Sequence, residues 1–348
     1  MSTAPEQVVI TDVLLRDGLQ NESTVLPLVD KLRLAYGLLE AGLTSLEVGS
    51  FVSPRKVPQL ADTDRLVARL RPGESVLLHT LVFNERGASR AIGARARDVR
   101  LTVSASDGHS LANAGVPRDE ALERLRPAVD VLRAHRVRLE ATIATAFVCP
   151  FDGETDPRTV VELARRLAGS GIRVLHLADT IGAASPWHIR RTVTAVRDAL
   201  PELPLGLHLH NTYGMASANV WEALRLGVRR FDAALGGIGG CPFAPGAAGN
   251  LGTDDLVNLS DHRTAGEHLP ASGATCCARA SSTVTGTSTA SACTSCSGRR
   301  PAPSAWTWSG SPGRRCSGCG TGPGRPPACT CATAPTARWC RWRRPTMW

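Results

Sequence analysis

Two histidines, His208 and His210, are separated by one residue inside the apolar run LGLHLHN at residues 205–211. In an extended strand, side chains two positions apart point to the same face, so both imidazoles can approach one ligand. Neutral imidazole binds divalent cations, and two imidazoles need an anionic oxygen ligand from elsewhere in the chain to complete such a site. The same spacing also occurs in ordinary core histidines, which is the alternative interpretation of this pair.

Asp17 is a candidate for the anionic ligand, because it follows Arg16 at the end of the apolar run 8–15. The alternative role of Asp17 is that of a turn or helix-capping residue. Two imidazoles combined with oxygen ligands suit Mg²⁺ or Mn²⁺, with coordination positions left open for water or substrate.

Eight strand-like apolar runs divide the first part of the chain, and amphipathic stretches of helical period lie between most of them. The runs cover residues 8–15, 45–51, 75–83, 99–106, 138–147, 173–182, 205–211 and 230–239. Strands that alternate with helices predict a parallel sheet, and eight such units in about 250 residues suit a (β/α)8 TIM barrel. An open doubly wound sheet is the alternative, but no G-x-G-x-x-G follows the first run.

In such a barrel, catalytic groups lie at the carboxyl ends of the strands. Polar residues collect in or at the ends of the predicted strands, and a glycine-rich segment, GGIGGCPFAPGAAGN, overlaps and follows the last run. These residues are Arg16, Asp17, Glu47, Asp179, His208 and His210. We therefore expect one barrel mouth to bring them together.

The composition changes near residue 260. After Asp261 the chain has eleven arginines, one acidic residue, nine cysteines, one leucine and one valine, so the net charge of +9 arises there. Such a stretch cannot bury enough apolar surface to offset its conformational entropy. We therefore expect a catalytic barrel over residues 1–259 and a disordered Arg/Cys/Gly/Pro/Ser/Thr-rich tail over residues 260–348.

The tail also carries a spacing that is typical of structural zinc sites, C-x2-C-x19-C-x2-C. Its cysteines are Cys293, Cys296, Cys316 and Cys319. Nine cysteines in a short stretch produce such pairs by composition, and no strand or turn pattern surrounds them, so we expect no zinc site. A nucleic-acid binder acting through the basic tail is the candidate from another class, but no motif for nucleic-acid binding accompanies the charge.

No run of 18 apolar residues and no secretion or transit signal is present, which predicts a cytoplasmic protein without a membrane partner. The body has only two cysteines, Cys149 and Cys241, which fits a reducing compartment. We expect Cys149 to be a packing residue and His79 to be a core histidine whose hydrogen-bonding groups are satisfied.

Five segments together resemble the 3-hydroxy-3-methylglutaryl-CoA lyase family, which belongs to the metal-dependent barrel lyases and Claisen-type synthases. The segments, in chain order, are RDGLQNE (16–22), EVGSFVSPRKVPQLAD (47–62), LADTIG (177–182), HLHNTYG (208–214) and GGIGGCPFAPGAAGNLGTDDLV (236–257). R-D-G-x-Q marks only the superfamily, whereas SFVSP and the cysteine loop are specific to the lyase branch.

The resemblance implies a role for each matched residue. Asp17, His208, His210 and Asn250 match the ligands of a divalent cation, Mg²⁺ or Mn²⁺. Arg16 matches the arginine that binds the substrate's carbonyl oxygen, and Cys241 matches the catalytic cysteine of a mobile loop. Gln20, Glu47 and Asp179 match polar substrate-binding positions.

The implied reaction cleaves 3-hydroxy-3-methylglutaryl-CoA to acetyl-CoA and acetoacetate, a step of leucine degradation. His208 or Asp17 would accept the hydroxyl proton, and Cys241 would protonate the enolate. The resemblance implies an acyl-CoA partner, no nucleic acid and no membrane, and it is compatible with a homodimer. The chain departs from the family's usual pattern at Leu14, Leu15, Asn211, Met215 and Asp254, which leaves a related acyl-CoA lyase as an alternative. A Claisen-type synthase is a second alternative.

The tail composition predicts a shift of reading frame near residue 260. The whole chain has two lysines, Lys31 and Lys56, against 38 arginines, which indicates a GC-rich gene. A slipped frame in GC-rich DNA yields a mixture of Arg, Cys, Trp, Gly and Pro, and the product could then be inactive. Sequencing the coding DNA across codon 260 tests this hypothesis, and an intact frame would contradict it.

Overall fold

The computed structural model of the protein describes residues 8–240 and 249–261. Eight parallel strands form a closed barrel, because β1 pairs with β2 on one side and with β10 on the other. The barrel strands are β1 (Val9–Asp12), β2 (Ser45–Ser50), β3 (Leu77–Val82), β4 (Asp98–Ser104), β5 (Arg138–Ala144), β8 (Leu175–Asp179), β9 (Leu205–Leu209) and β10 (Arg230–Ala233). Each lies within or overlaps one of the eight predicted runs, so the predicted (β/α)8 barrel is confirmed.

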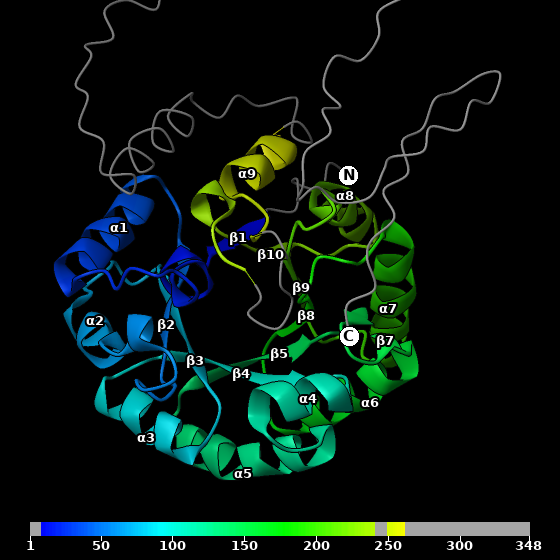
Figure 1. Cartoon of the computed structure of the whole chain (residues 1–348), viewed down its shortest axis with the longest axis horizontal. Helices are drawn as coiled ribbons and strands as arrows, with labels where there is room; N and C mark the ends of the chain where they lie inside the picture. The colour runs from blue at the N-terminus through cyan, green and yellow to red at the C-terminus, as the bar shows by residue number, and fades with distance from the viewer. Residues whose placement is uncertain (1–7, 241–248, 262–348) are drawn as a thin grey trace, which may run out of the picture. The chain divides into compact units, whose positions relative to one another are not determined.

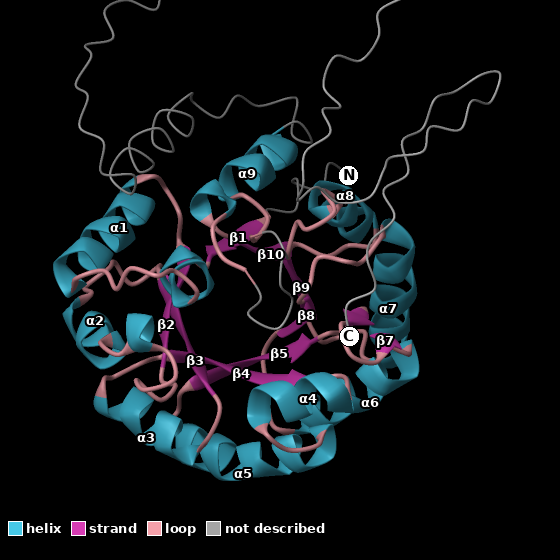
Figure 2. Ribbon diagram, viewed as in Figure 1, coloured by secondary structure: helices cyan, strands magenta, loops and turns pink. Residues whose placement is uncertain are grey.

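Helices surround this barrel on the outside (Figure 1; helices are cyan and strands magenta in Figure 2). They are α1 (Leu28–Glu40), α2 (Thr63–Arg69), α3 (Glu85–Gly93), α4 (Asp107–Ala114), α5 (Arg118–Ala134), α6 (Pro157–Gly169), α7 (Pro186–Ala199), α8 (Ala216–Arg225) and α9 (Thr253–Asp261). A short antiparallel hairpin, β6 (Val148–Cys149) and β7 (Gly153–Glu154), lies between β5 and α6. Among the described helices, none is long and apolar enough to cross a membrane.

Helix α6 shows how local sequence sets these elements. Asp156 precedes the helix, and its side chain accepts a hydrogen bond of 2.9 Å from the backbone N–H of Arg158. Pro157 occupies the first helical position, where a missing N–H costs nothing. The buried residues recur at helical spacing and face the barrel: Val160, Leu163, Ala164 and Leu167.

The strands divide their side chains between an apolar outer face and a polar inner face. Outward residues such as Leu46, Val99 and Leu101 belong to the hydrophobic core between strands and helices. Alternate residues are charged or hydrogen-bonding groups that are also buried: Glu47, His79, Arg100, Glu140, His176, His208 and Asp232. Interiors of such barrels are usually dominated by Val, Ile and Leu, so this polar interior is unusual.

The first predicted strand is shorter than its apolar run. β1 ends at Asp12, and residues Leu14–Gly18 form a single π-helical turn. Asp12 ends the strand, because its carboxylate accepts the Leu14 N–H at 2.9 Å, the Leu235 N–H at 2.9 Å and the Thr253 hydroxyl at 2.7 Å. The turn is also buried, and a short buried run does not distinguish a strand from a helical turn.

The predicted tail lies almost completely outside the described residues. Ser260 and Asp261 are the last residues of α9, and residues 262–348, with the four spaced cysteines, are not described. The prediction of an unfolded, frame-shifted tail therefore stays a prediction. Cys149 and His79 are both buried, as expected. Nε2 of His79 lies 3.1 Å from Oγ of Ser45, but its Nδ1 has no hydrogen-bond partner among the described residues, so the ring is not fully hydrogen-bonded as expected.

We expect the ion pair between Arg138 and Asp98, at the amino ends of β5 and β4, to stabilise the barrel. The guanidinium donates to both oxygens of Asp98 at 2.5 Å, and Asp98 is buried whereas Arg138 is partly exposed. Arg138→Gln should lower the free energy of unfolding by about 2 kcal/mol, between the values for exposed and buried pairs. Urea denaturation would measure this loss.

The control is Arg158→Gln, because Arg158 also donates to both oxygens of Asp156, to Oδ1 at 3.3 Å and to Oδ2 at 2.7 Å, but in an exposed position. Its midpoint should match that of the wild type. The prediction would be contradicted if both variants lost the same stability or if neither variant lost any.

Candidate metal centre

The carboxyl ends of the strands bring the predicted ligands to one site. Asp17 lies on the π-helical turn after β1, His208 lies in β9, and His210 follows β9 directly. π-Helical turns are rare and occur frequently at functional sites. All three side chains are buried. The same-face arrangement predicted from the spacing of the histidines is therefore present.

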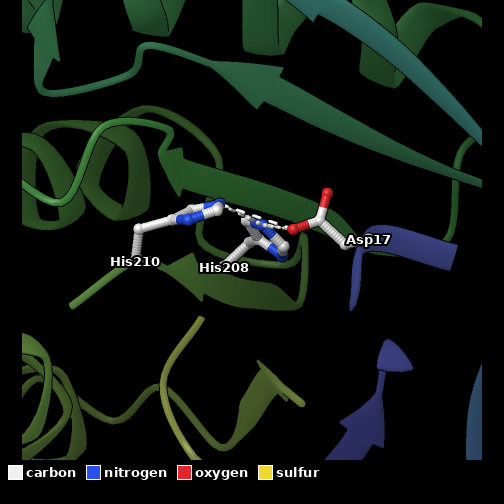
Figure 3. A group of neighbouring side chains, drawn as sticks. All are labelled: Asp17, His208 and His210. Carbon is white, nitrogen blue, oxygen red and sulfur yellow. Dashed lines mark hydrogen bonds and ion pairs between the residues drawn. The ribbon is translucent and has the colours of Figure 1, made fainter. Parts of the chain in front are cut away.

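The three side chains point toward one another (Figure 3). The Nε2 atoms of His208 and His210 lie 3.3 Å apart. Oδ2 of Asp17 lies 3.6 Å from Nε2 of His210 and 3.9 Å from Nε2 of His208. Two imidazole nitrogens and one carboxylate oxygen thus converge from separate parts of the chain.

These separations fit a divalent cation. A point equidistant from three atoms at these distances lies roughly 2.1 Å from each of them, which is the bond length of Mg²⁺ to its ligands. Imidazole nitrogen and carboxylate oxygen are also ligands for Mn²⁺ and Zn²⁺. The buried Asp17, His208 and His210 group is consistent with a divalent-metal site.

Asn250, the fourth predicted ligand, lies against this group. Its Nδ2 donates to Oδ2 of Asp17 at 2.8 Å and to the carbonyl oxygen of Ile238 at 2.9 Å. Its Oδ1 is buried and has no hydrogen-bond partner among the described residues. A buried amide oxygen without a donor is costly, and a hard cation would satisfy it.

Arg16 neutralises one side of the site. Its Nε donates to Oε2 of Glu47 at 2.6 Å, and a second guanidinium nitrogen donates to Oδ1 of Asp17. Burial opposes ionisation of Asp17, but Arg16 and the two imidazoles outweigh burial and lower the pKa of Asp17 from 3.8 to about 2. Asp17 is therefore an anion at neutral pH, as a metal ligand requires.

The predicted substrate-binding residues have different neighbours. Gln20 donates to Oδ1 of Asp17 at 2.8 Å, and Glu47 is completely buried behind Arg16. Asp179, at the end of β8, is also completely buried, and its two oxygens accept the backbone N–H groups of Ala183 and Ala184 at 3.0 Å. Burial raises the pKa of Asp179 to about 6, although these amide contacts oppose the rise. These three residues thus support the site and its turns in the structure.

One predicted site residue, Cys241, lies outside the described residues, and the sequence analysis did not predict the site residue Asp232. Cys241 falls in the segment 241–248, which is not described. Asp232 was not predicted, yet its Oδ2 lies 3.2 Å from Nδ1 of His208. A proton on Nδ1 donates to this carboxylate and leaves the Nε2 lone pair for a cation. The available signal was a charged residue in the middle of an apolar strand.

Comparison with known proteins places the chain in a family. A family model described as HMGL-like matches residues 7–273, which include the site and all the described strands and helices of the barrel. The chain belongs to the HMGL-like family. The family resemblance deduced from the sequence motifs is therefore confirmed.

Relatives within the HMGL-like family differ in the substrates that their names give. A protein of Pseudomonas aeruginosa named 3-hydroxy-3-isohexenylglutaryl-CoA/hydroxy-methylglutaryl-CoA lyase is 38% identical over 255 residues, 73% of this chain and 85% of that one. The (R)-citramalyl-CoA lyase of Chloroflexus aurantiacus is 41% identical over 264 residues, 73% of this chain and 83% of that one.

A solved HMGL-like structure supports the same assignment. The HMG-CoA lyase of Acinetobacter baumannii in complex with coenzyme A and 3-methylmalate is 37% identical and superposes with a TM-score of 0.75. The match covers 82% of this chain and 92% of that one. The barrel of this chain is thus similar to that of a protein whose structure holds coenzyme A.

We expect the chain to bind Mn²⁺. His210→Ala should raise the Kd for Mn²⁺ roughly 100-fold or more, because loss of a direct ligand should exceed the 10–100-fold cost of losing an outer-shell partner. Free Mn²⁺ gives an electron paramagnetic resonance signal that is lost on binding, so a titration yields the Kd. The control is His135→Ala, which removes an exposed histidine after α5. Equal Mn²⁺ affinity in wild type and His210→Ala would contradict the site.

Proposed function

We propose that this chain is a divalent-metal-dependent lyase that cleaves 3-hydroxy-3-methylglutaryl-CoA to acetyl-CoA and acetoacetate. The observation that carries the proposal is the convergence of Asp17, His208 and His210 beside the Arg16 guanidinium. The substrate class is inferred from the named relatives, most of which are hydroxymethylglutaryl-CoA lyases.

Asp17, His208, His210 and Asn250 would hold Mg²⁺ or Mn²⁺. When bound, such a cation lowers the pKa of a hydroxyl group coordinated to it and fixes the orientation of that group. The four side chains come from the turn after β1, from the end of β9 and from the segment before α9. Asn250 is hydrogen-bonded to Asp17, and Asp17, His208 and His210 are buried, which limits the reorganisation that binding requires.

Arg16 would stabilise negative charge on the substrate oxygen. Cleavage converts the C–O–H of a tertiary alcohol into a ketone and leaves the electron pair of the broken carbon–carbon bond on the thioester enolate. A guanidinium stays charged at all working pH values and donates from a rigid fork. Glu47 holds Arg16 through Nε at 2.6 Å, which fixes the direction of that fork.

Asp17 is our choice as acceptor of the hydroxyl proton. With Nε2 of His208 on the cation and Nδ1 directed to Asp232 at 3.2 Å, His208 would have no ring nitrogen left to take a proton. Oδ2 of Asp17 is the oxygen that faces the two imidazoles, so its Oδ1 would accept the proton. Cys241, outside the described residues, is our choice as donor of the proton that converts the enolate into acetyl-CoA.

A second candidate substrate is citramalyl-CoA, because the Chloroflexus aurantiacus relative that carries this name is 41% identical. Its cleavage breaks the same type of bond and gives acetyl-CoA and pyruvate. The two substrates differ by one methylene between the carbinol carbon and the free carboxylate. Recognition of this one methylene would change the relative kcat/KM for the two substrates by the equivalent of about 1–3 kcal/mol.

The test is product formation by the full chain with each acyl-CoA and Mg²⁺ or Mn²⁺. We expect acetoacetate from 3-hydroxy-3-methylglutaryl-CoA, no turnover after EDTA treatment, and a lower kcat/KM for citramalyl-CoA. Arg16→Met should lower kcat by roughly 100–1000-fold, as loss of an oxyanion-stabilising donor does. The control is Arg158→Met, which removes an exposed arginine of α6.

Release of pyruvate at the higher kcat/KM would replace the substrate assignment while retaining the lyase chemistry. Release of free CoA only when a 2-oxo acid is supplied would indicate a Claisen-type synthase instead. Full activity after EDTA treatment would contradict the role of the metal.

A further inference from the structure

Arg100 is an unpredicted charged residue at the centre of the barrel. It lies in β4, and its side chain is 1% exposed. Its NH1 donates to Oδ2 of Asp232 at 2.6 Å, and its NH2 donates to Oε2 of Glu140 at 3.1 Å. A third carboxylate, Glu47, lies 3.7 Å from NH1. One guanidinium thus contacts side chains from three other strands.

Two of these carboxylates also hold residues of the candidate site. Asp232 lies 3.2 Å from Nδ1 of His208, through the same oxygen that accepts from Arg100. Glu47 accepts from Nε of Arg16 at 2.6 Å. Arg100 is therefore connected by one carboxylate to a candidate metal ligand and by another to the candidate oxyanion-binding arginine.

We propose that Arg100 is a positioning residue, which fixes His208 through Asp232 and Arg16 through Glu47. This inference rests on the metal site of the proposed function. Arg100 touches neither the metal ligands nor the substrate, and it acts by fixing the carboxylates that orient them. Loss of Arg100 would leave Asp232 buried with an uncompensated charge.

Position 100 requires the planar guanidinium of arginine, with its two separate donor nitrogens. NH1 is directed to Asp232 and Glu47, while NH2 is directed to Glu140 and lies 3.2 Å from Nε2 of His176. Lysine has one compact ammonium group and cannot reproduce two donor positions with a fixed separation. Burial opposes the charge on Arg100, but the three carboxylates outweigh it and raise its pKa, so the fork stays charged.

The neighbouring backbone also accommodates the network. His176 lies 3.2 Å from Oε2 of Glu140 and so fixes the carboxylate on the far side of Arg100. Gly206, in β9, makes room for the His176 ring, because a Cβ at position 206 would lie 2.5 Å from its Nδ1. Five strands, β2, β4, β5, β8 and β10, therefore supply side chains to one hydrogen-bonded and ion-paired group.

The experiment measures Mn²⁺ affinity and kinetics of the full chain carrying Arg100→Lys. We expect a folded protein whose Kd for Mn²⁺, measured without substrate, rises 10–100-fold, as after loss of other outer-shell partners. The kcat should fall by at least the same factor, while KM for the acyl-CoA changes less than threefold. The control is Arg190→Lys, which alters a 2.6 Å ion pair with Glu222 on the outside of the barrel.

A lower thermal midpoint with unchanged Mn²⁺ affinity and kcat would show a purely structural role and overturn the proposal. If Arg100→Lys yields no folded protein, Asp232→Asn provides the same test, because Arg100 acts on His208 through Asp232. Folded Asp232→Asn with wild-type Mn²⁺ affinity would overturn it.

The two proposals fail in different ways. Wild-type protein that binds Mn²⁺ but cleaves neither acyl-CoA contradicts the proposed substrate, and the Mn²⁺ comparison still decides the role of Arg100. Wild-type protein that binds no Mn²⁺ overturns both the metal site and the positioning role.

Discussion

Charge compensation is the constraint on which the interior of this barrel depends. Carboxylates contact the guanidinium of Arg16 or Arg100 at four positions: Asp17, Glu47, Glu140 and Asp232. These four carboxylates share two guanidinium groups, so the candidate metal ligand Asp17 and the interior carboxylates are compensated by the same two cations. A buried carboxylate without a counter-charge is strongly destabilising, so the ligand set and the interior belong to one electrostatic unit.

Stability and chemistry use opposite faces of the same strands. Outward residues such as Leu46 and Leu101 pack against the helices, whereas their neighbours Glu47 and Arg100 face the interior. Because side chains alternate along a strand, a shift of one residue in register would exchange the two sets. The apolar layer therefore fixes the register that aligns the polar one.

The sequence predicted the barrel and the approach of His208 and His210 to each other because both depend on local patterns. Eight apolar runs separated by helical stretches define the strands, and the one-residue spacing of His208 and His210 places both on one face. The partners of Arg100 could not be predicted in this way, because Asp232 is 132 residues away and meets it only when the barrel closes. The apolar run also continues from β1 into the π-helical turn, so hydrophobicity gave no sign of where the strand ends.

Asp179 shows a second limit of pattern-based prediction. A carboxylate at the end of a strand fits both an active-site role and the support of a turn. In the structure its oxygens accept hydrogen bonds from the amides of Ala183 and Ala184 in the β8–α7 turn, and its predicted role in substrate binding stays a prediction. Residue type and strand position alone do not distinguish these two uses of a carboxylate.

The position of Arg100 has a consequence for how the chain folds. Its shortest contact is to β10, the last strand of the barrel, whereas Arg100 itself lies in β4. A partly formed barrel that ended before β10 would either keep this guanidinium hydrated or bury it with one compensating carboxylate missing. Stable half-barrel intermediates are thereby disfavoured, and contacts of such large sequence separation form slowly. During synthesis, the native interior can form only after residue 232 has left the ribosome.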